Sequence, residues 1–194
     1  MMRTHVLPTV VGALLAAGAM QVAAQEDAAR LEEARKMAGT MVQTLGGRLQ
    51  AAIKEGGPAA AIGVCTTVAP TLAGELSRQN GVKLTRVSLR VRNPLLGTPD
   101  AWEQGVLQSF EARLAKGEAA DKLEFAETVT EPAGKYFRYM KALPVQPVCV
   151  NCHGDAANLA PEIKERIARE YPADCATGYL PGQIRGAVSV KRPL

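Results

Sequence analysis

The segment Cys149-Val150-Asn151-Cys152-His153 carries more structural information than any other part of this 194-residue chain. Two thiols separated by two residues and followed at once by an imidazole form the attachment sequence of a c-type haem. The thiols reach the two vinyl groups of the porphyrin, and the histidine binds the iron. The segment therefore predicts one covalently bound haem, with Cys149 and Cys152 as anchors and His153 as the proximal ligand.

Two other uses of these cysteines explain less of the pattern. A zinc site needs four ligands, and beyond the three residues of the motif the chain offers only Cys65 and Cys175 as soft donors. Four cysteines also suffice for two disulfides. Neither alternative explains why a histidine follows Cys152 directly.

The first 24 residues have the pattern of an export signal. Arg3 supplies a positive start, residues 6–20 are apolar, and Val22-Ala23-Ala24 precede a cleavage point. The apolar run is short for a membrane span. We expect cleavage to leave residues 25–194 as a soluble periplasmic protein, which fits haem attachment outside the cytoplasm. Without cleavage, the run would remain as a membrane tether.

Composition and length predict a single domain. The chain carries 23 basic and 19 acidic residues, a formal net charge of +4, and these charges are mixed along the sequence without basic runs. This balance argues against nucleic acid as a partner. Residues 25–194 suit one hydrophobic core and contain no linker, repeat or low-complexity tract.

Apolar residues spaced three or four apart predict two helices after the leader. The first extends from residue 31 to the glycine pair Gly56-Gly57, and the second pattern, over residues 61–76, places Cys65 toward a core. Pro70 lies inside the second pattern and cannot donate a hydrogen bond to the carbonyl of Thr66. The second helix should therefore kink or restart just after Cys65.

Period-two alternation begins at residue 84. Over residues 84–92, apolar side chains alternate with a polar face that carries Arg86, Arg90 and Arg92, and Asn93-Pro94 should end the strand. The three arginines are candidates to pair with the haem propionates, with Arg185 as a fourth. The alternative is a solvated basic face.

The later elements complete an α+β domain with an antiparallel sheet. We expect a helix from Pro99 to Gly117, a hairpin over residues 123–143, and a helix between Pro161 and Pro172. A last strand should place Ile184, Val188 and Val190 on one face. These strands distinguish the chain from the four-helix cytochromes c-prime, which have none.

The iron has a second axial position to fill. His5 belongs to the leader, so His153 is the only histidine of the expected mature chain, and bis-histidine ligation within one chain is excluded. Cys65, Cys175, a methionine, a lysine amine and an open site remain. Cys65 is alternatively a buried hydrophobe or half of a disulfide with Cys175. Methionine is more often a core residue than an iron ligand. The methionines that could serve as the ligand are Met37, Met41 and Met140.

Several segments resemble one known family over most of the expected mature chain. They include Ala61-Ile62-Gly63-Val64-Cys65, Arg92-Asn93-Pro94, Pro99-Asp100-Ala101-Trp102-Glu103, Cys149 to Gly154, Ala176-Thr177-Gly178-Tyr179 and Gly182 to Ala187. On these residues the chain resembles the PAS-like c-type haem domains, first described as a domain of unknown function and found as small exported proteins and as sensor portions of bacterial receptors. The resemblance implies a PAS-like fold and an iron held by His153 and the thiolate of Cys65.

Three features depart from the family pattern. Gln183 stands where an acid is expected, the loop over residues 94–99 is a residue longer, and Cys175 lies where cysteine is not required. Cys175 either pairs with Cys65 or is a free thiol. We favour the free thiol because ligation suits Cys65 better.

Three functions remain from different classes. A thiolate ligand stabilises ferric iron, and its loss on reduction would open a site for a diatomic gas, as in a redox or gas sensor that acts through a periplasmic partner protein. The second function is a small electron carrier. An enzyme, such as a sulfur-compound oxidoreductase, is the weakest, because two filled axial positions leave no substrate site and no second histidine serves as a base.

Overall fold

The computed structural model describes the backbone of residues 11–194 and the side chains of residues 24–194. The start of the predicted leader, including Arg3 and His5, lies outside the described residues, so the export signal stays a prediction. Among the described helices, no single one is long and apolar enough to cross a membrane. One bent pair, Ala24–Ala60 with Val64–Asn80, meets the criteria of length and composition together.

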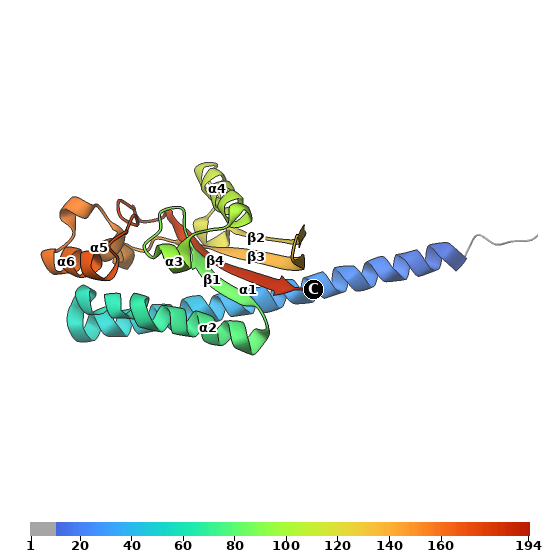
Figure 1. The fold of residues 1–194 in the computed structure, drawn as a ribbon. Helices are drawn as coiled ribbons and strands as arrows, with labels where there is room; N and C mark the ends of the chain where they lie inside the picture. The colour runs from blue at the N-terminus through green and yellow to red at the C-terminus, as the bar shows by residue number, and fades with distance from the viewer. Residues whose placement is uncertain (1–10) are drawn as a thin grey trace, which may run out of the picture.

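A four-stranded antiparallel sheet carries helices on both faces (Figure 1). The strands are β1 (Lys83–Val87), β2 (Glu124–Glu131), β3 (Gly134–Pro144) and β4 (Ile184–Pro193), in the order β1-β4-β3-β2. Helices α1 (Val11–Ala60) and α2 (Ala69–Asn80) lie along one face, and α4 (Ala101–Ala115) covers the other. The predicted α+β fold with an antiparallel sheet and long N-terminal helices is confirmed.

The long helix α1 is broken where the sequence predicted its end. Gly56 and Gly57 have non-helical backbone angles, and Gly57 adopts a positive φ of 74° that glycine tolerates best. Before this break, the apolar face of α1 packs Met37 and Met41 against Tyr139 of β3 and Val188 of β4. The three-or-four spacing therefore marks the face that contacts the sheet.

A π-helix precedes α2 at the position where the sequence predicted a distortion. It extends over Val64–Val68 and contains Cys65, and Pro70 lies in the first turn of α2. Proline suits a first turn because its nitrogen needs no intrahelical acceptor there. The π-helix therefore leads directly into α2. Cys65 within it is half-buried.

The strand predicted over residues 84–92 is shorter than its alternation indicates. β1 ends at Val87, and the chain turns at Ser88, whose hydroxyl oxygen lies 2.7 Å from the carbonyl oxygen of Arg185 and 2.9 Å from that of Arg90. Asn93 then caps the short helix α3 (Pro94–Gly97) by accepting a hydrogen bond from a backbone N–H. The prediction of one strand face shared by Arg86, Arg90 and Arg92 is therefore wrong.

The last strand contains a second departure from simple alternation. Val188 and Val190 share one face, as predicted, and pack with α1, but Ile184 packs in the cluster under α4. The pairing of β3 with β4 shifts register between Leu143 and Pro144, opposite the start of β4. Because a bulge changes which face a side chain occupies, Ile184 does not share the face of Val188.

The α4 face contains a buried ion cluster centred on Arg138 of β3. α4 begins at a capping box in which Asp100 and Glu103 each bond the other's backbone N–H. The Arg138 guanidinium lies 2.6 Å from Asp100, 3.5 Å from Glu103 and 3.1 Å from Glu131, and its side chain is 3% exposed. The Trp102 ring covers it at 4.2 Å. Carboxylates of this chain thus surround the cation.

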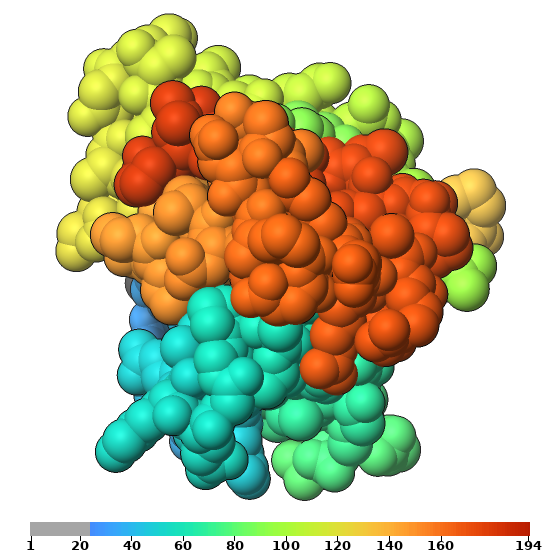
Figure 2. All heavy atoms as spheres, turned by 90° about the vertical axis from the view of Figure 1, so that its left-hand side faces the viewer, coloured from blue at the N-terminus to red at the C-terminus, as the bar shows by residue number. Residues whose placement is uncertain are grey.

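One end of the sheet is closed by residues 145–183, which we call the cap segment. It contains η3 (Pro147–Cys149), α5 (Val150–His153), η4 (Ala156–Asn158) and α6 (Pro161–Glu170), the last as predicted. Figure 2 views the molecule from this end and shows the cap segment (orange) resting on the turn between α1 and α2 (cyan). Ile163 and Ile167 of α6 form that contact with Ile62.

Candidate functional site

Two cavities lie between the helices α1 and α2, the sheet and the cap segment. The first, of about 310 Å³, is bordered by α2, β1 and the loop that follows β1, and we call it the α2 cavity. The second, of about 290 Å³, is bordered by α1, the end of β3 and the cap segment, and we call it the α1 cavity. The residues that line both, and so join them, are Cys65, Arg86, Arg92, Leu143, His153, Tyr171 and Arg185.

The motif that opened the sequence analysis faces the α1 cavity. Cys149, Cys152 and His153 all line it. The opposite wall is the apolar face of α1, which includes Leu45 and Leu49. Burial raises the pKa of the Cys152 thiol, which keeps it protonated at neutral pH. The structure therefore brings both predicted anchors and the predicted proximal ligand to one cavity.

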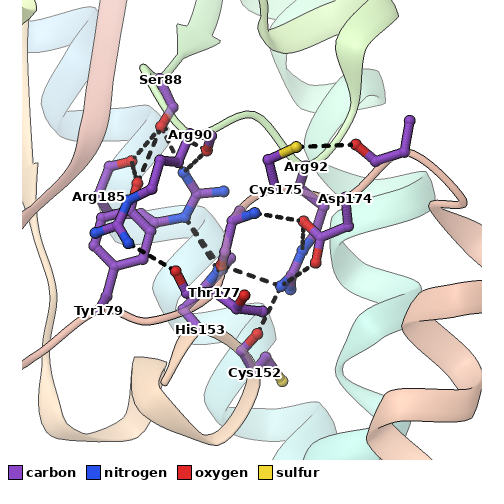
Figure 3. Close-up of polar contacts among 12 residues, drawn as sticks. Ser88, Arg90, Arg92, Cys152, His153, Asp174, Cys175, Thr177, Tyr179 and Arg185 are labelled. Carbon is purple, nitrogen blue, oxygen red and sulfur yellow. Dashed lines mark hydrogen bonds and ion pairs between the residues drawn. The ribbon is translucent and has the colours of Figure 1, made fainter. Parts of the chain in front are cut away.

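A hydrogen bond to a backbone carbonyl fixes the orientation of the His153 ring (Figure 3). Its Nδ1 lies 2.7 Å from the carbonyl oxygen of Ala176, so Nδ1–H is the donor of this bond and Nε2 keeps its lone pair. Burial, and then the charges of Arg185 and Arg92, lower the pKa of His153 well below its ordinary value. The imidazole is therefore neutral at physiological pH and presents the nitrogen that binds metals.

The segment Ala176-Thr177-Gly178-Tyr179, which we call the clamp segment, binds the backbone of the haem motif through hydrogen bonds. The backbone N–H of Tyr179 donates to the carbonyl of His153 at 2.9 Å, and that of Gly178 donates to Gly154 at 2.7 Å. Gly178 has a positive φ of 75°, and a Cβ on Gly154 would lie 2.6 Å from the carbonyl oxygen of Val150. Two segments of the family resemblance thus meet here, and each requires a glycine.

Arg92 fixes the motif through a buried ion pair with Asp174. Arg92 Nε and Nη2 each lie 3.1 Å from an Asp174 oxygen, and both side chains are 8% exposed. The same Nη2 donates to the carbonyl of Cys152 at 2.6 Å. Asp174 has no local sequence signal, because its partner is 82 residues away. Sequence reasoning therefore missed this residue.

Arg90 lies apart from both cavities. It is exposed, donates to the carbonyl of Thr177 at 2.8 Å, and stacks on the Tyr179 ring with 3.6 Å between the guanidinium carbon and the ring centre. Only Arg86 and Arg92 of the three predicted arginines line a cavity. Arg90 serves to hold the clamp segment in place.

Cys65 and Tyr171 lie at the junction of the cavities. Cys65 is a free thiol in the π-helix, on an element different from the one that supplies His153. Tyr171 is buried, and burial followed by the nearby Cys65 raises its pKa to about 12. Met41 lines the far part of the α1 cavity, whereas Met37 and Met140 are core residues. Cys175 is an exposed free thiol, as favoured from the sequence.

Comparison with known proteins supports the resemblance drawn from the sequence. The sequence model of the Tll0287-like family matches residues 15–193. The chain belongs to the Tll0287-like family. A solved structure, the crystal structure of the cyanobacterial heme-protein Tll0287, matches with a TM-score of 0.61 at 25% sequence identity, over 87% of this chain and 95% of that chain. No similar protein was found among curated sequences.

The match to the Tll0287-like family extends over the elements that build both cavities. Residues 15–193 include α2, the π-helix, the sheet and the whole cap segment. The family relationship therefore applies to the candidate site as well as to the fold, and the identification as a member of a haem-binding sensory family is confirmed at this level.

Proposed function

We propose that this chain is a periplasmic c-type cytochrome that carries one haem and acts in redox or gas sensing. Cys149 and Cys152 would bind the haem covalently, with His153 and Cys65 as axial ligands. The observation that carries the proposal is that these four side chains line one continuous space. The printed description of the similar solved protein as a heme-protein supports the same cofactor.

The lining of the cavities fits an iron porphyrin. Apolar residues of α1 supply a wall for a hydrophobic ring, and Gly46 on that wall has open space where a Cβ would be. The donor set consists of an imidazole and thiols, which are usual haem and haem-attachment ligands. No carboxylate lines either cavity within residues 24–194, whereas three arginines do. This charge pattern suits a cofactor that brings its own carboxylates.

Each residue of the site has a separate task. The bound haem supplies a ferric–ferrous couple. His153, oriented by Ala176, offers Nε2 as a fixed ligand, and Arg92 holds the carbonyl of Cys152. Cys65 offers a thiolate, which favours the ferric state and a low potential. Because a thiolate is held less strongly by a reduced metal, Cys65 would be the residue that leaves on reduction, which would open a position for a diatomic gas.

A sensor of this kind needs a partner for its output. The described residues build the cavities, the sheet and the cap segment. We propose that a signal produced here passes to a second protein in the periplasm, the compartment indicated by the predicted leader. We do not expect nucleic acid as that partner, because the charges lack basic runs.

Mass and absorption spectra test the cofactor and its attachment directly. Protein matured with the cytochrome c assembly system should gain the mass of one haem and give a c-type pyridine haemochrome spectrum. The Cys149→Ser, Cys152→Ser double variant should give neither. Unmodified mass in the wild-type protein after such maturation would reject the proposal.

Ligation by Cys65 has its own test. Cys65→Ser should keep the covalent haem but lose the charge-transfer and magnetic signatures of a ferric thiolate, and its midpoint potential should rise. Carbon monoxide added to reduced wild-type protein should change the spectrum if Cys65 has left the iron. The matched control is Cys175→Ser, which alters an exposed thiol and should change none of these properties.

A small electron carrier is the second candidate function. Leu96 lines the α2 cavity and is 55% exposed, and its neighbour Leu95 is almost fully exposed. The cavity therefore reaches the surface beside an apolar contact area of the kind that redox partners use. Stopped-flow reduction separates the two functions: fast reversible exchange without a ligand change indicates a carrier, and slow exchange with altered coordination indicates a sensor.

A further inference from the structure

We infer that Arg86 and Arg185 are the side chains that bind the two haem propionates, and that Arg90 and Arg92 are not. This inference rests on the proposed function. The sequence left propionate binding open to four arginines, and the structure selects two of them. The distinction comes from the partners that each guanidinium already has within the chain.

Arg90 and Arg92 are already committed to structural contacts. Arg92 shares a buried two-point ion pair with Asp174, so its charge is compensated without a ligand. Arg90 is bonded to carbonyls of the clamp segment, stacks on Tyr179, and lines neither cavity. Arg92 thus has Nε and Nη2 bonded within the chain, and Arg90 does not line the space where a cofactor would bind.

Arg86 is the opposite case. It projects from β1, is half-buried, and lines both cavities. Within the described residues it has no hydrogen-bond or ion-pair partner. A guanidinium carries five N–H donors, and partial burial without acceptors is unfavourable unless a ligand supplies them. Arg86 is thus a cation without an internal counter-ion among the described residues, so it can bind an anionic ligand.

Arg185 is largely buried but has only neutral acceptors. Its Nη1 donates to Ser88 Oγ at 2.8 Å and to the carbonyl of Arg90 at 3.2 Å, and its Nε lies beside the His153 ring (Figure 3). Arg86 and Arg92 line the same two cavities as Arg185, so three positive charges gather there and repel one another. An anion close to Arg185 would remove this repulsion.

The number and the place of these cations match a haem. Two uncompensated guanidinium groups correspond to two propionates, and guanidinium binds carboxylate through two parallel bonds. Cys149 and Cys152 line only the α1 cavity, whereas Arg86 and Arg185 line the junction with the α2 cavity. The charges are thus separated from the thiol anchors, as the vinyl and propionate groups on opposite edges of a porphyrin require.

Resonance Raman spectra of covalently loaded protein test the assignment. The propionate bending band should shift in Arg86→Gln and in Arg185→Gln, because each variant removes a charged hydrogen-bond donor from one propionate. Arg90→Gln is the matched control and should leave the band in place. Wild-type protein that lacks haem by mass would overturn the proposed function, whereas loaded variants with unshifted bands would overturn only this inference.

A binding measurement covers the case in which Arg185→Gln fails to mature. Haemin and its dimethyl ester share the same porphyrin and iron, but the ester carries a methyl group on each propionate and has lost both propionate charges. Both can be offered to protein with the Cys149→Ser, Cys152→Ser background. The background protein should bind haemin more tightly than the ester. Arg86→Gln should reduce this preference about tenfold or more, the usual worth of a charge-assisted bond. An undiminished preference, with Arg90→Gln as the reference, would contradict the inference.

Discussion

The two faces of the sheet contain arginines in opposite electrostatic situations. On the α4 face, Arg138 is buried among Asp100, Glu103 and Glu131, and Trp102 covers it. On the helical face, Arg86 and Arg185 line a cavity that no carboxylate of residues 24–194 lines. The first arrangement is complete within the chain and stabilises the fold, whereas the second lacks a compensating carboxylate and is the one that we propose binds a ligand. A half-buried cation without a compensating charge is therefore a candidate binding residue.

The largest expected effect contrasts these two groups directly. Arg138→Met should lower the free energy of unfolding by about 3–5 kcal/mol, because it leaves Glu103, with a side chain 7% exposed, as an unpaired buried charge. Arg86→Met should change it by less than about 0.5 kcal/mol in protein without haem, since no internal partner is lost. Urea unfolding of both variants measures the contrast. Equal losses would remove the distinction between the two faces.

Two glycine substitutions compare the cap segment with α4. Gly154→Ala should cost about 1–3 kcal/mol, because its Cβ would lie 2.6 Å from a backbone carbonyl that cannot move freely. Gly105→Ala on α4 meets no atom within 4 Å and should instead raise helix stability by up to about 1 kcal/mol. Thermal unfolding of the two variants gives the signs. A stable Gly154→Ala protein would mean that the motif is held less tightly than described.

Gly46→Ala should change the stability of the protein and its affinity for haemin in opposite directions. The substitution lies in the middle of α1 and should stabilise the protein without haem by about 1 kcal/mol, because alanine is the better helix former. Its Cβ enters open space on the α1 cavity wall, so haemin affinity in the Cys149→Ser, Cys152→Ser background should fall. Gly39→Ala, also on α1 and with open space at its Cβ, lines neither cavity and should change stability alone.

The smallest effect concerns the pH dependence of the α4 face. Although burial opposes ionisation of Asp100, the hydrogen bonds from Arg138 and from the backbone of Glu103 hold its pKa below the ordinary 3.8. Its contribution to stability is present above that value and is lost as the pH falls through the lower pKa of the folded state. The difference in urea midpoint between wild type and Asp100→Asn should therefore shrink between pH 6 and pH 2. A constant difference would contradict the ion pair.

The sequence predicted the elements whose signals are local. The glycine pair Gly56-Gly57, the helix start near Pro99 and the distortion around Pro70 all depend on the chemistry of single residues, and each is present in the structure. The motif Cys149–His153 likewise predicted three residues that line the α1 cavity. Local signals are reliable because the physical cause acts within a few residues.

The errors arose where distant segments determine the local structure. Alternation predicted a strand through Arg92, but Ser88 is bound to the backbone of Arg185, 97 residues away, and turns the chain out of the sheet. The pairing of Arg92 with Asp174 and the register shift before Ile184 also join distant segments. Spacing along the chain carries no information about such contacts, so the division of roles among the arginines required the structure.

The length of α1 before its break at Gly56 has a mechanical consequence. The N-terminal part of α1 projects beyond the sheet (Figure 1), and Leu49 farther along the helix borders the α1 cavity. Ala24 and Leu49 belong to the same straight stretch and are about 38 Å apart along its axis. A stiff rod pivoting where it rests on the sheet acts as a lever. A slight tilt at the cavity end would therefore become a larger displacement at the far tip, so a change at the proposed haem site could be felt well away from the cavity without unfolding of the domain.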